Sequence, residues 1–125
     1  MTLRCLIVDD SAEFVAAARD LLERQGVEVV GVASTGAEAL VSVDELRPDV
    51  ALVDIDLGEE SGLDVVRRLS DSVERLPLVL ISTYSENDVA DVIAASPAVG
   101  FLTKATLSAT AIERILAGTS ARRDT

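Results

Sequence analysis

The side chains most able to do chemistry in this 125-residue chain are four aspartates, two neighbouring hydroxyl residues and a single lysine. They are Asp9, Asp10, Asp54, Asp56, Ser82, Thr83 and Lys104. Crowded carboxylates repel one another, so either their pKa values rise or a cation binds among them. Oxygen ligands that leave room for water suit Mg²⁺ better than zinc. An aspartate beside a divalent ion can attack phosphorus and form an aspartyl-phosphate, while a lysine and a hydroxyl stabilise the phosphoryl oxygens.

Each of these residues follows a short apolar run, which is what would bring them together. The runs cover residues 3–8, 27–33, 50–53, 78–81 and 99–102. They are continuous rather than alternating, as is typical of strands covered on both faces in a parallel sheet. Ligands bind such open sheets beyond the carboxyl ends of the strands. The first, third, fourth and fifth runs are followed by the candidate residues, so we predict one site at one edge of the sheet.

The segments between the runs have a helical period. Apolar residues at 14, 17, 18, 21 and 22 form one helix face, Ser11 is placed to cap that helix, and similar faces begin near 37, 63, 89 and 111. Five strands alternating with five helices predict a three-layer α/β fold with right-handed crossovers. The length favours an open doubly wound parallel sheet, because an eight-stranded barrel needs about 250 residues.

Composition excludes several classes of function. The chain has no His, which excludes catalysis by a Ser-His-Asp or Cys-His group and any His-based zinc site. Its one Cys, Cys5, excludes an internal disulfide and a thiolate metal cluster. A net charge of −11 argues against direct nucleic-acid binding. The first apolar run stops at Asp9, too short for a signal peptide or a membrane span, so we expect a cytoplasmic protein without a membrane partner.

Each candidate residue by itself has a simpler interpretation. The Asp9-Asp10 pair could cap a helix, Ser82 and Thr83 could satisfy nearby backbone groups, and a lone lysine could reflect an arginine-rich composition. Their shared placement after different strands favours a functional site.

Five stretches of the chain carry a resemblance to a known family. They read CLIVDD at 5–10, PDVALVD at 48–54, GL at 62–63, PLVLIS at 77–82 and GFLTK at 100–104. Together they resemble the receiver domain of two-component response regulators, a short, actinobacterial type among them. The resemblance implies the flavodoxin-like strand order 2-1-3-4-5, a receiver domain over residues 1–118 and a flexible tail over 119–125.

The resemblance also implies a role for each candidate residue. Asp54 would accept a phosphoryl group from a histidine kinase or phosphotransfer protein. Mg²⁺ would be held by Asp9, Asp10, Asp54 and the backbone carbonyl of Asp56. Lys104 would pair with the phosphoryl group, Ser82 and Phe101 would form the switch, and Asp56 and Tyr84 would flank the attacking water and tune its access.

The chain departs from the family pattern in three places. Residues 57–62 read LGEESG where many members have Pro-Gly, which predicts a more flexible and more acidic loop. Ala105 follows Lys104 where many members have Pro, and a non-proline cis bond costs ~3 kcal/mol, so the family's cis peptide is less expected. Phe101 lacks a hydroxyl, so its movement would be a packing change.

The function implied is a phosphorylation-dependent signalling switch, not an enzyme beyond its own phosphotransfer and autodephosphorylation. Phosphorylation would shift the face formed by a helix at about 86–95, the fifth strand and the fifth helix, where an output protein or a second copy would dock. The kinase would dock on the first helix near Phe14, Val15 and Ala18. Only seven residues follow Gly118, so a single-domain receiver is expected.

Two alternatives remain open at this stage. The chain could be the receiver half of a DNA-binding response regulator whose effector domain is absent. Asp54-Ile55-Asp56 also matches the Asp-x-Asp motif of haloacid-dehalogenase-type phosphatases, but in that family this motif comes first and the acidic pair follows the lysine. A phosphate-binding loop at 31–36 is disfavoured because Ala37-Glu38 replaces the Lys-Ser/Thr pair.

Overall fold

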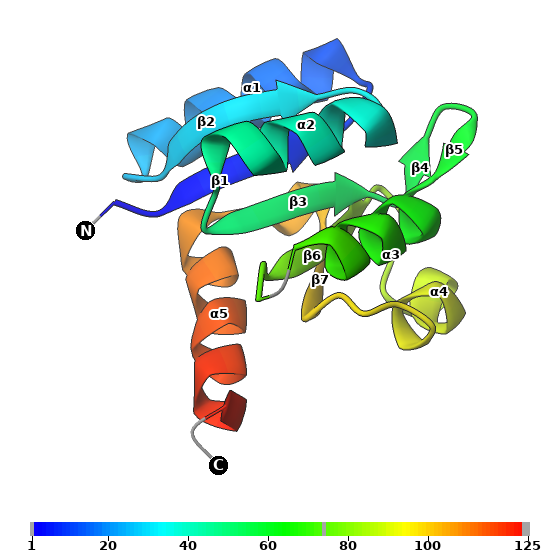
Figure 1. Ribbon diagram of the computed structural model, residues 1–125. Coiled ribbons are helices and arrows are strands. Elements are labelled where there is room, and N and C mark those ends of the chain that lie inside the picture. The colour runs from blue at the N-terminus through cyan, green and yellow to red at the C-terminus, as the bar shows by residue number, and fades with distance from the viewer. Residues whose placement is uncertain (1, 74, 124–125) are drawn as a thin grey trace.

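All five apolar runs form strands of one parallel sheet in the computed structural model, which describes residues 2–73 and 75–123 (Figure 1). The strands are β1 (Arg4–Val8), β2 (Glu28–Ala33), β3 (Val50–Asp54), β6 (Leu78–Ser82) and β7 (Gly100–Thr103). Their order in the sheet is β2-β1-β3-β6-β7. Every neighbouring pair is parallel. The predicted order 2-1-3-4-5 is therefore confirmed for the five strands of this sheet.

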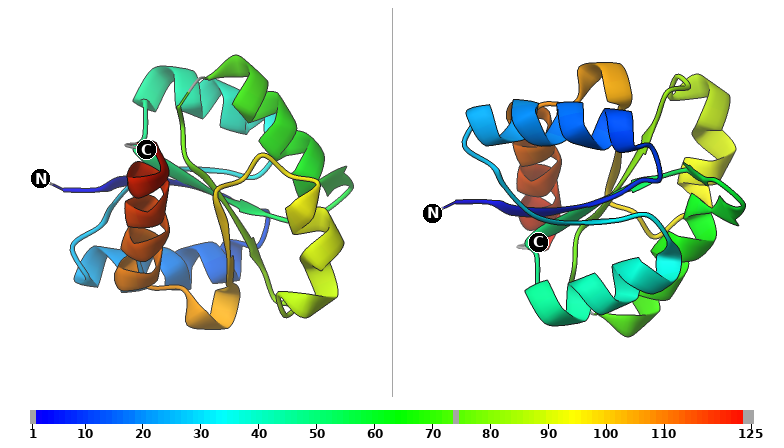
Figure 2. Two further views of the ribbon diagram at one scale, coloured as in Figure 1. Left: turned by 90° about the horizontal axis from the view of Figure 1, so that it is seen from below. Right: turned by 90° about the horizontal axis from the view of Figure 1, so that it is seen from above.

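Helices cover both faces of the sheet and make the predicted three layers (Figure 2). They are α1 (Ala12–Arg24), α2 (Gly36–Leu46), α3 (Gly62–Ser72), α4 (Ala90–Ala94) and α5 (Ala109–Arg123). Helices α1 and α5 lie on one face, and α2, α3 and α4 lie on the other. Each crossover between parallel strands carries a helix, as the right-handed β-α-β connection requires.

Successive residues of a strand pack into opposite halves of the core. Cys5 and Ile7 of β1 join the cluster under α1 and α5, while Leu6 and Val8 join the cluster under α2 and α3. All five residues of β3 are buried, Asp54 included. This two-sided burial explains why the runs are apolar at every position rather than at every second one.

A short hairpin after β3 was not predicted. Strands β4 (Asp56–Leu57) and β5 (Glu60–Ser61) pair antiparallel around Gly58-Glu59, and Gly58 has a φ of 60°. Glycine at the first central position with positive φ is the pattern of a type II′ turn. A two-residue strand is too short to show a hydrophobic period, so the sequence pattern does not predict it. Glu60 Oε1 accepts a hydrogen bond from Gly36 N at 2.9 Å, so the loop expected to be flexible is fastened to the start of α2.

Two other elements differ from expectation. The helix expected at about 86–95 is a 3₁₀ turn, η1 (Asn87–Val89), followed by α4, because Val89 leaves helical angles with φ −118° and ψ 17°. Helix α5 continues past Gly118 to Arg123, since Gly118 keeps a helical backbone at a cost of only ~1 kcal/mol. Of the tail expected over 119–125, residues 119–123 therefore continue α5, and 124–125 lie outside the described residues.

Candidate functional site

The carboxyl ends of four strands bring the candidate residues to one edge of the sheet. Asp9 follows β1, Asp54 ends β3, Ser82 ends β6 and Lys104 follows β7, where it begins the 3₁₀ turn η2 (Lys104–Thr106). Asp9, Asp54 and Ser82 are 2%, 6% and 1% exposed, which is unusual for polar residues. The peptide bond between Lys104 and Ala105 is trans. The predicted gathering of these residues is confirmed by the fold.

Lys104 is shared between the two buried carboxylates. Its Nζ lies 2.7 Å from Asp9 Oδ2 and 3.0 Å from Asp54 Oδ2. The same ammonium lies 4.3 Å from the centre of the Phe14 ring, which belongs to the first turn of α1. One cation therefore faces two anions and one aromatic ring.

The other carboxylate oxygens are satisfied by the loops that follow the strands. Asp9 Oδ1 accepts a hydrogen bond from Ser11 N at 2.8 Å, and Asp54 Oδ1 accepts one from Asp56 N at 3.1 Å. Both aspartates thus turn one oxygen to their own loop and the other toward the lysine. These local bonds fix the orientation of each carboxylate.

The same edge has the donor set for a hard cation. Asp9, Asp10 and Asp54 each offer an oxygen within 4.8 Å of the others, and Asp10 is exposed. Asp9 Oδ2 is buried and, within the described part of the chain, receives no hydrogen bond of good geometry, although Lys104 Nζ is close. Three carboxylates this close together, with one ammonium beside them, fit a divalent cation with oxygen ligands.

Burial and neighbouring charge shift the pKa values of this group in ways that have separate causes. Burial raises the pKa of Asp54, and the negative charge of Asp9 raises it further, against the opposing effects of Asp56 N and Lys104. Burial alone would lower the pKa of Lys104, but its contacts with Asp9 and Asp54 outweigh burial and raise it. The lysine stays charged, while Asp54 is held in a site with an excess of negative charge.

The remaining predicted residues lie around this core. Ser82 Oγ accepts a hydrogen bond from Tyr84 N at 3.0 Å, and the Tyr84 side chain is 55% exposed. Asp56 is exposed at the start of β4. Phe101 is half-buried on β7 and packs against the cluster under α2 and α3.

Two residues at the site were missed as site residues. The sequence predicts Phe14 on the apolar face of α1 and near the kinase docking surface, but no sequence signal places its ring against Lys104. Gly62, at the start of α3, lies so close to β3 that a Cβ built on it would be 2.0 Å from the Asp54 carbonyl oxygen. The GL pair at 62–63 marks the position in the sequence but not this contact.

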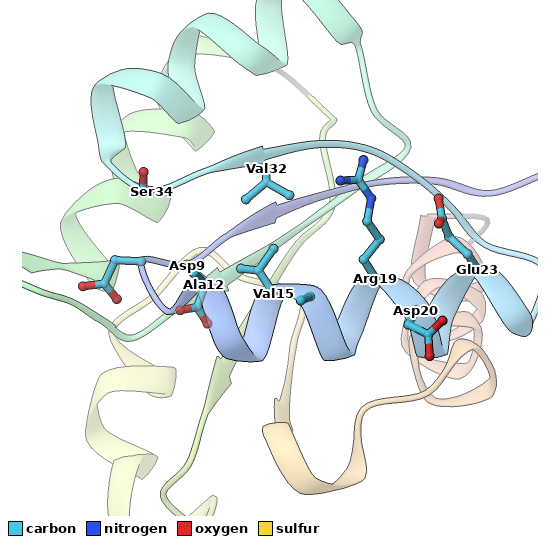
Figure 3. A pocket seen from close by; sticks show the side chains of 10 residues that line it. Asp9, Ala12, Val15, Arg19, Asp20, Glu23, Val32 and Ser34 are labelled. Carbon is cyan, nitrogen blue, oxygen red and sulfur yellow. The ribbon is translucent and has the colours of Figure 1, made fainter.

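A groove of about 560 Å³ opens beside the acidic cluster, between α1 and β2 (Figure 3). Asp9 and Asp10 lie at one end, and Ala12, Val15, Ala16, Val32 and Arg19 are among the residues that line it. Arg19 Nη2 donates to Val29 O at 3.3 Å on the edge strand. Ala18 is only 3% exposed and Phe14 faces Lys104, so of the three residues expected near the docking surface only Val15 lines the groove.

No helix among the described residues is both long enough and apolar enough to cross a bilayer.

The family model described as response regulator receiver domain matches residues 5–116. A protein-glutamate methylesterase/protein-glutamine glutaminase of Archaeoglobus fulgidus is 35% identical over 104 residues, which are 82% of this chain and 30% of that protein. The chemotaxis protein CheY of Thermotoga maritima is 38% identical over 69 residues, 55% of this chain and 58% of CheY.

Solved structures of similar chains agree with the fold. The signal receiver domain of a modulated diguanylate cyclase from Desulfovibrio desulfuricans G20 has a TM-score of 0.79 and 30% identity, covering 99% of this chain and 98% of that one. The signal receiver domain of the putative response regulator NarL from Mycobacterium tuberculosis has a TM-score of 0.77 and 27% identity, covering 95% and 97%. The matched part of this chain spans 23% of the length of a Nocardioides methylesterase relative and 30% of the Archaeoglobus one.

Proposed function

We propose, since the chain belongs to the response regulator receiver domain family, that it is a phosphorylation-dependent signalling switch in which Asp54 accepts the phosphoryl group. The observation that carries this proposal is the contact of the Asp54 carboxylate with Lys104, the only lysine of the chain, beside two further carboxylates. An aspartate ion-paired only for stability would not need this excess of negative charge.

The reaction would transfer a phosphoryl group from a phosphohistidine of a kinase or phosphotransfer protein. A carboxylate oxygen of Asp54 would bond to phosphorus as the phosphorus–nitrogen bond breaks, leaving the donor histidine neutral after it takes a proton. The ammonium of Lys104 would stabilise the negative charge on the phosphoryl oxygens. Asp9 Oδ2, 2.7 Å from that ammonium, would keep it at the site.

The metal proposed for the acidic cluster is Mg²⁺. Asp9, Asp10 and Asp54 would hold it with the backbone carbonyl of Asp56. When bound it would neutralise charge on the phosphoryl oxygens. Asp9 and Asp54 are buried and Asp10 is exposed, so water and the phosphodonor would reach the cluster from the side of Asp10.

The signal would leave the site through Ser82 and Phe101. Ser82 lies buried at the end of β6, and Phe101 lies half-buried on the neighbouring strand β7. Movement of the Ser82 hydroxyl toward the phosphoryl group would open space that Phe101 fills, and this would shift the face formed by α4, β7 and α5. We propose that an output protein or a second copy of the chain binds this face. Asp56 and Tyr84 would tune the access of water to the phosphoryl group.

The phosphodonor protein would enter through the groove between α1 and β2 (Figure 3). The groove begins at Asp9 and Asp10, so a histidine carried along α1 would arrive beside Asp54. Its small side chains, Ala12 and Ala16, leave room for a partner helix.

We further propose that the protein acts in the cytoplasm, binds neither nucleic acid nor membrane directly, and has no separate substrate.

Mass spectrometry with a small-molecule phosphodonor and Mg²⁺ tests the acceptor. We expect one added phosphoryl group in the natural chain and none in Asp54→Ala. Asp44→Ala is a matched control, since Asp44 is an exposed aspartate on α2. Continued labelling of Asp54→Ala would refute the assignment.

Titration calorimetry with Mg²⁺ tests the metal ligands. Asp10 is exposed, so Asp10→Ala should fold normally and bind Mg²⁺ more weakly than the natural chain. Asp44→Ala should bind it with unchanged affinity. Equal affinities for the natural chain and Asp10→Ala would contradict the ligand set.

A further inference from the structure

The ring of Phe14 is an uncharged group that the structure places against the Lys104 ammonium. The ring centre lies 4.3 Å from Nζ, within the range in which an aromatic face attracts a cation. The two charged neighbours of Nζ, Asp9 Oδ2 and Asp54 Oδ2, lie 2.7 and 3.0 Å away. The lysine side chain is 13% exposed, so these contacts act where little water competes.

The position of Phe14 is fixed by the same loop that orients Asp9. Ser11 N donates to Asp9 Oδ1, and Ser11 Oγ accepts from Phe14 N at 3.3 Å as the N-cap of α1. The first turn of α1 therefore connects the Asp9 carboxylate, the cap and the aromatic ring through two hydrogen bonds. The backbone of Phe14 is therefore held at the helix start, and from there its ring reaches the lysine.

Resting on the function proposed above, we propose that Phe14 is a positioning residue that holds the Lys104 ammonium in place for phosphoryl transfer to Asp54. A lysine side chain has four rotatable methylene groups and loses much freedom when it is fixed. Its attraction to Asp9 and Asp54 depends on charges that change when a cation or a phosphoryl group arrives. The contact with the ring depends on neither carboxylate, so it keeps the ammonium at the site through that change.

A purely structural role for Phe14 is the competing explanation. The ring is partly buried and packs against the cluster under α1 and α5, so its removal costs stability in either case. The two explanations differ in what they predict for Lys104 and for the transfer rate, which a packing defect elsewhere on α1 would leave unchanged.

Lysine-selective ¹³C labelling gives a direct view of the contact, because Lys104 is the only lysine of the chain. The ring current of Phe14 should move the Lys104 Hε resonances upfield. We expect Phe14→Leu to lose this shift, Phe14→Tyr to retain it, and Leu21→Ala to retain it. Leu21 is a matched control, since it is an apolar residue of α1, 38% exposed and outside the groove.

The second readout is the rate constant of phosphorylation by a small-molecule phosphodonor with Mg²⁺. We expect a fall of roughly three- to tenfold in Phe14→Leu, the size of a partly desolvated cation–π contact, with Phe14→Tyr and Leu21→Ala within about twofold of the natural chain. A Phe14→Leu variant that loses the shift but keeps the natural rate constant overturns the proposal, as does an equal loss of rate in Leu21→Ala.

If Phe14→Leu does not fold, the experiment uses a variant with pentafluorophenylalanine at position 14 instead. The fluorinated ring keeps the shape but reverses the quadrupole, so the rate constant should fall as for Phe14→Leu. An unchanged rate constant would overturn the role of the ring. The lysine shift needs no phosphorylation, so it survives a failure of the acceptor assignment, which Asp54→Ala tests separately.

Discussion

Two buried carboxylates share one ammonium at the centre of the site. Asp9 and Asp54 are both less than one-tenth exposed, and Lys104 reaches an oxygen of each. Exposed Asp10 adds a third negative charge at the same place. The group therefore has more negative than positive charge in the described residues, and a divalent cation would neutralise this excess.

The raised pKa of Asp54 leads to a prediction about stability and pH. Burial raises the pKa of the Asp54 carboxyl in the folded chain above its value in the unfolded chain. The free energy of unfolding therefore falls as pH rises toward the folded-state pKa of this carboxyl. In the presence of a chelator, Asp54→Asn should therefore be more stable than the natural chain at neutral pH. The difference should shrink as pH falls through the folded-state pKa and vanish below the lower pKa of the unfolded chain. Urea unfolding over a pH series measures both.

Mg²⁺ provides the internal control for this prediction. A cation bound to the folded chain alone raises the free energy of unfolding, so Mg²⁺ should stabilise the natural chain more than Asp54→Asn. An Asp54→Asn variant that is less stable at neutral pH without metal would contradict the argument.

At the scale of elements, backbone contacts hold the helices and loops against the site. Gly62 N donates to Ile55 O at 2.7 Å, and the missing Cβ of Gly62 lets α3 start directly beside the end of β3. Glu60 of the hairpin accepts from Gly36 N and lies 3.8 Å from Arg68, which joins the hairpin to α2 and α3. The position of the hairpin is therefore set by elements on both sides of it.

A pair of glycine substitutions tests the contact between α3 and β3. In Gly62→Ala the Cβ would meet the Asp54 carbonyl oxygen at 2.0 Å, so backbone must move and stability should fall by ~3 kcal/mol or more. In Gly118→Ala the Cβ meets nothing within 4 Å in helix α5, so stability should rise by about 0.5–1 kcal/mol. Thermal unfolding measures both variants.

The same pair distinguishes a local clash from a general effect of adding a methyl group. Gly62→Ala should also weaken Mg²⁺ binding, because the end of β3 carries Asp54, whereas Gly118→Ala should leave Mg²⁺ binding unchanged. A Gly62→Ala variant as stable as the natural chain would show that the close approach is absent in solution.

The whole molecule is a sheet with a closed core on each face. Cys5 lies in the core under α1 and α5 and is fully buried. Burial raises the pKa of its thiol from 9.0 to about 12. The thiol is therefore uncharged and enclosed at physiological pH, which agrees with a structural rather than a reactive role.

Labelling of Cys5 should report the unfolding of the entire domain. The native chain should react with a thiol reagent only as fast as the domain opens, and chain unfolded in urea should react at once. Cys5 is the only cysteine, so the signal has one source. Rapid, complete labelling under native conditions would indicate that the core around β1 opens separately from the rest.

Much of this architecture follows from the sequence by itself. Each strand of the sheet is an apolar run bounded by polar residues, and parallel strands put the ends of all such runs at one edge. Asp9, Asp54, Ser82 and Lys104 therefore could be assigned to one site before any contact was known. The resemblance to receiver domains added the roles of these residues and the strand order, which alternation of strands and helices does not determine.

Tertiary structure alone decided the details of the site. Lys104 contacts Asp54 across 50 residues of sequence, and no local pattern states which carboxylate a lysine will reach or which ring will lie beside it. The hairpin β4–β5 and the 3₁₀ turn η1 before α4 are too short to show a hydrophobic period in the sequence. The close approach of Gly62 depends on how α3 packs on β3. Local patterns specify elements because neighbouring residues share one backbone geometry, whereas these contacts depend on the relative positions of elements distant in the chain.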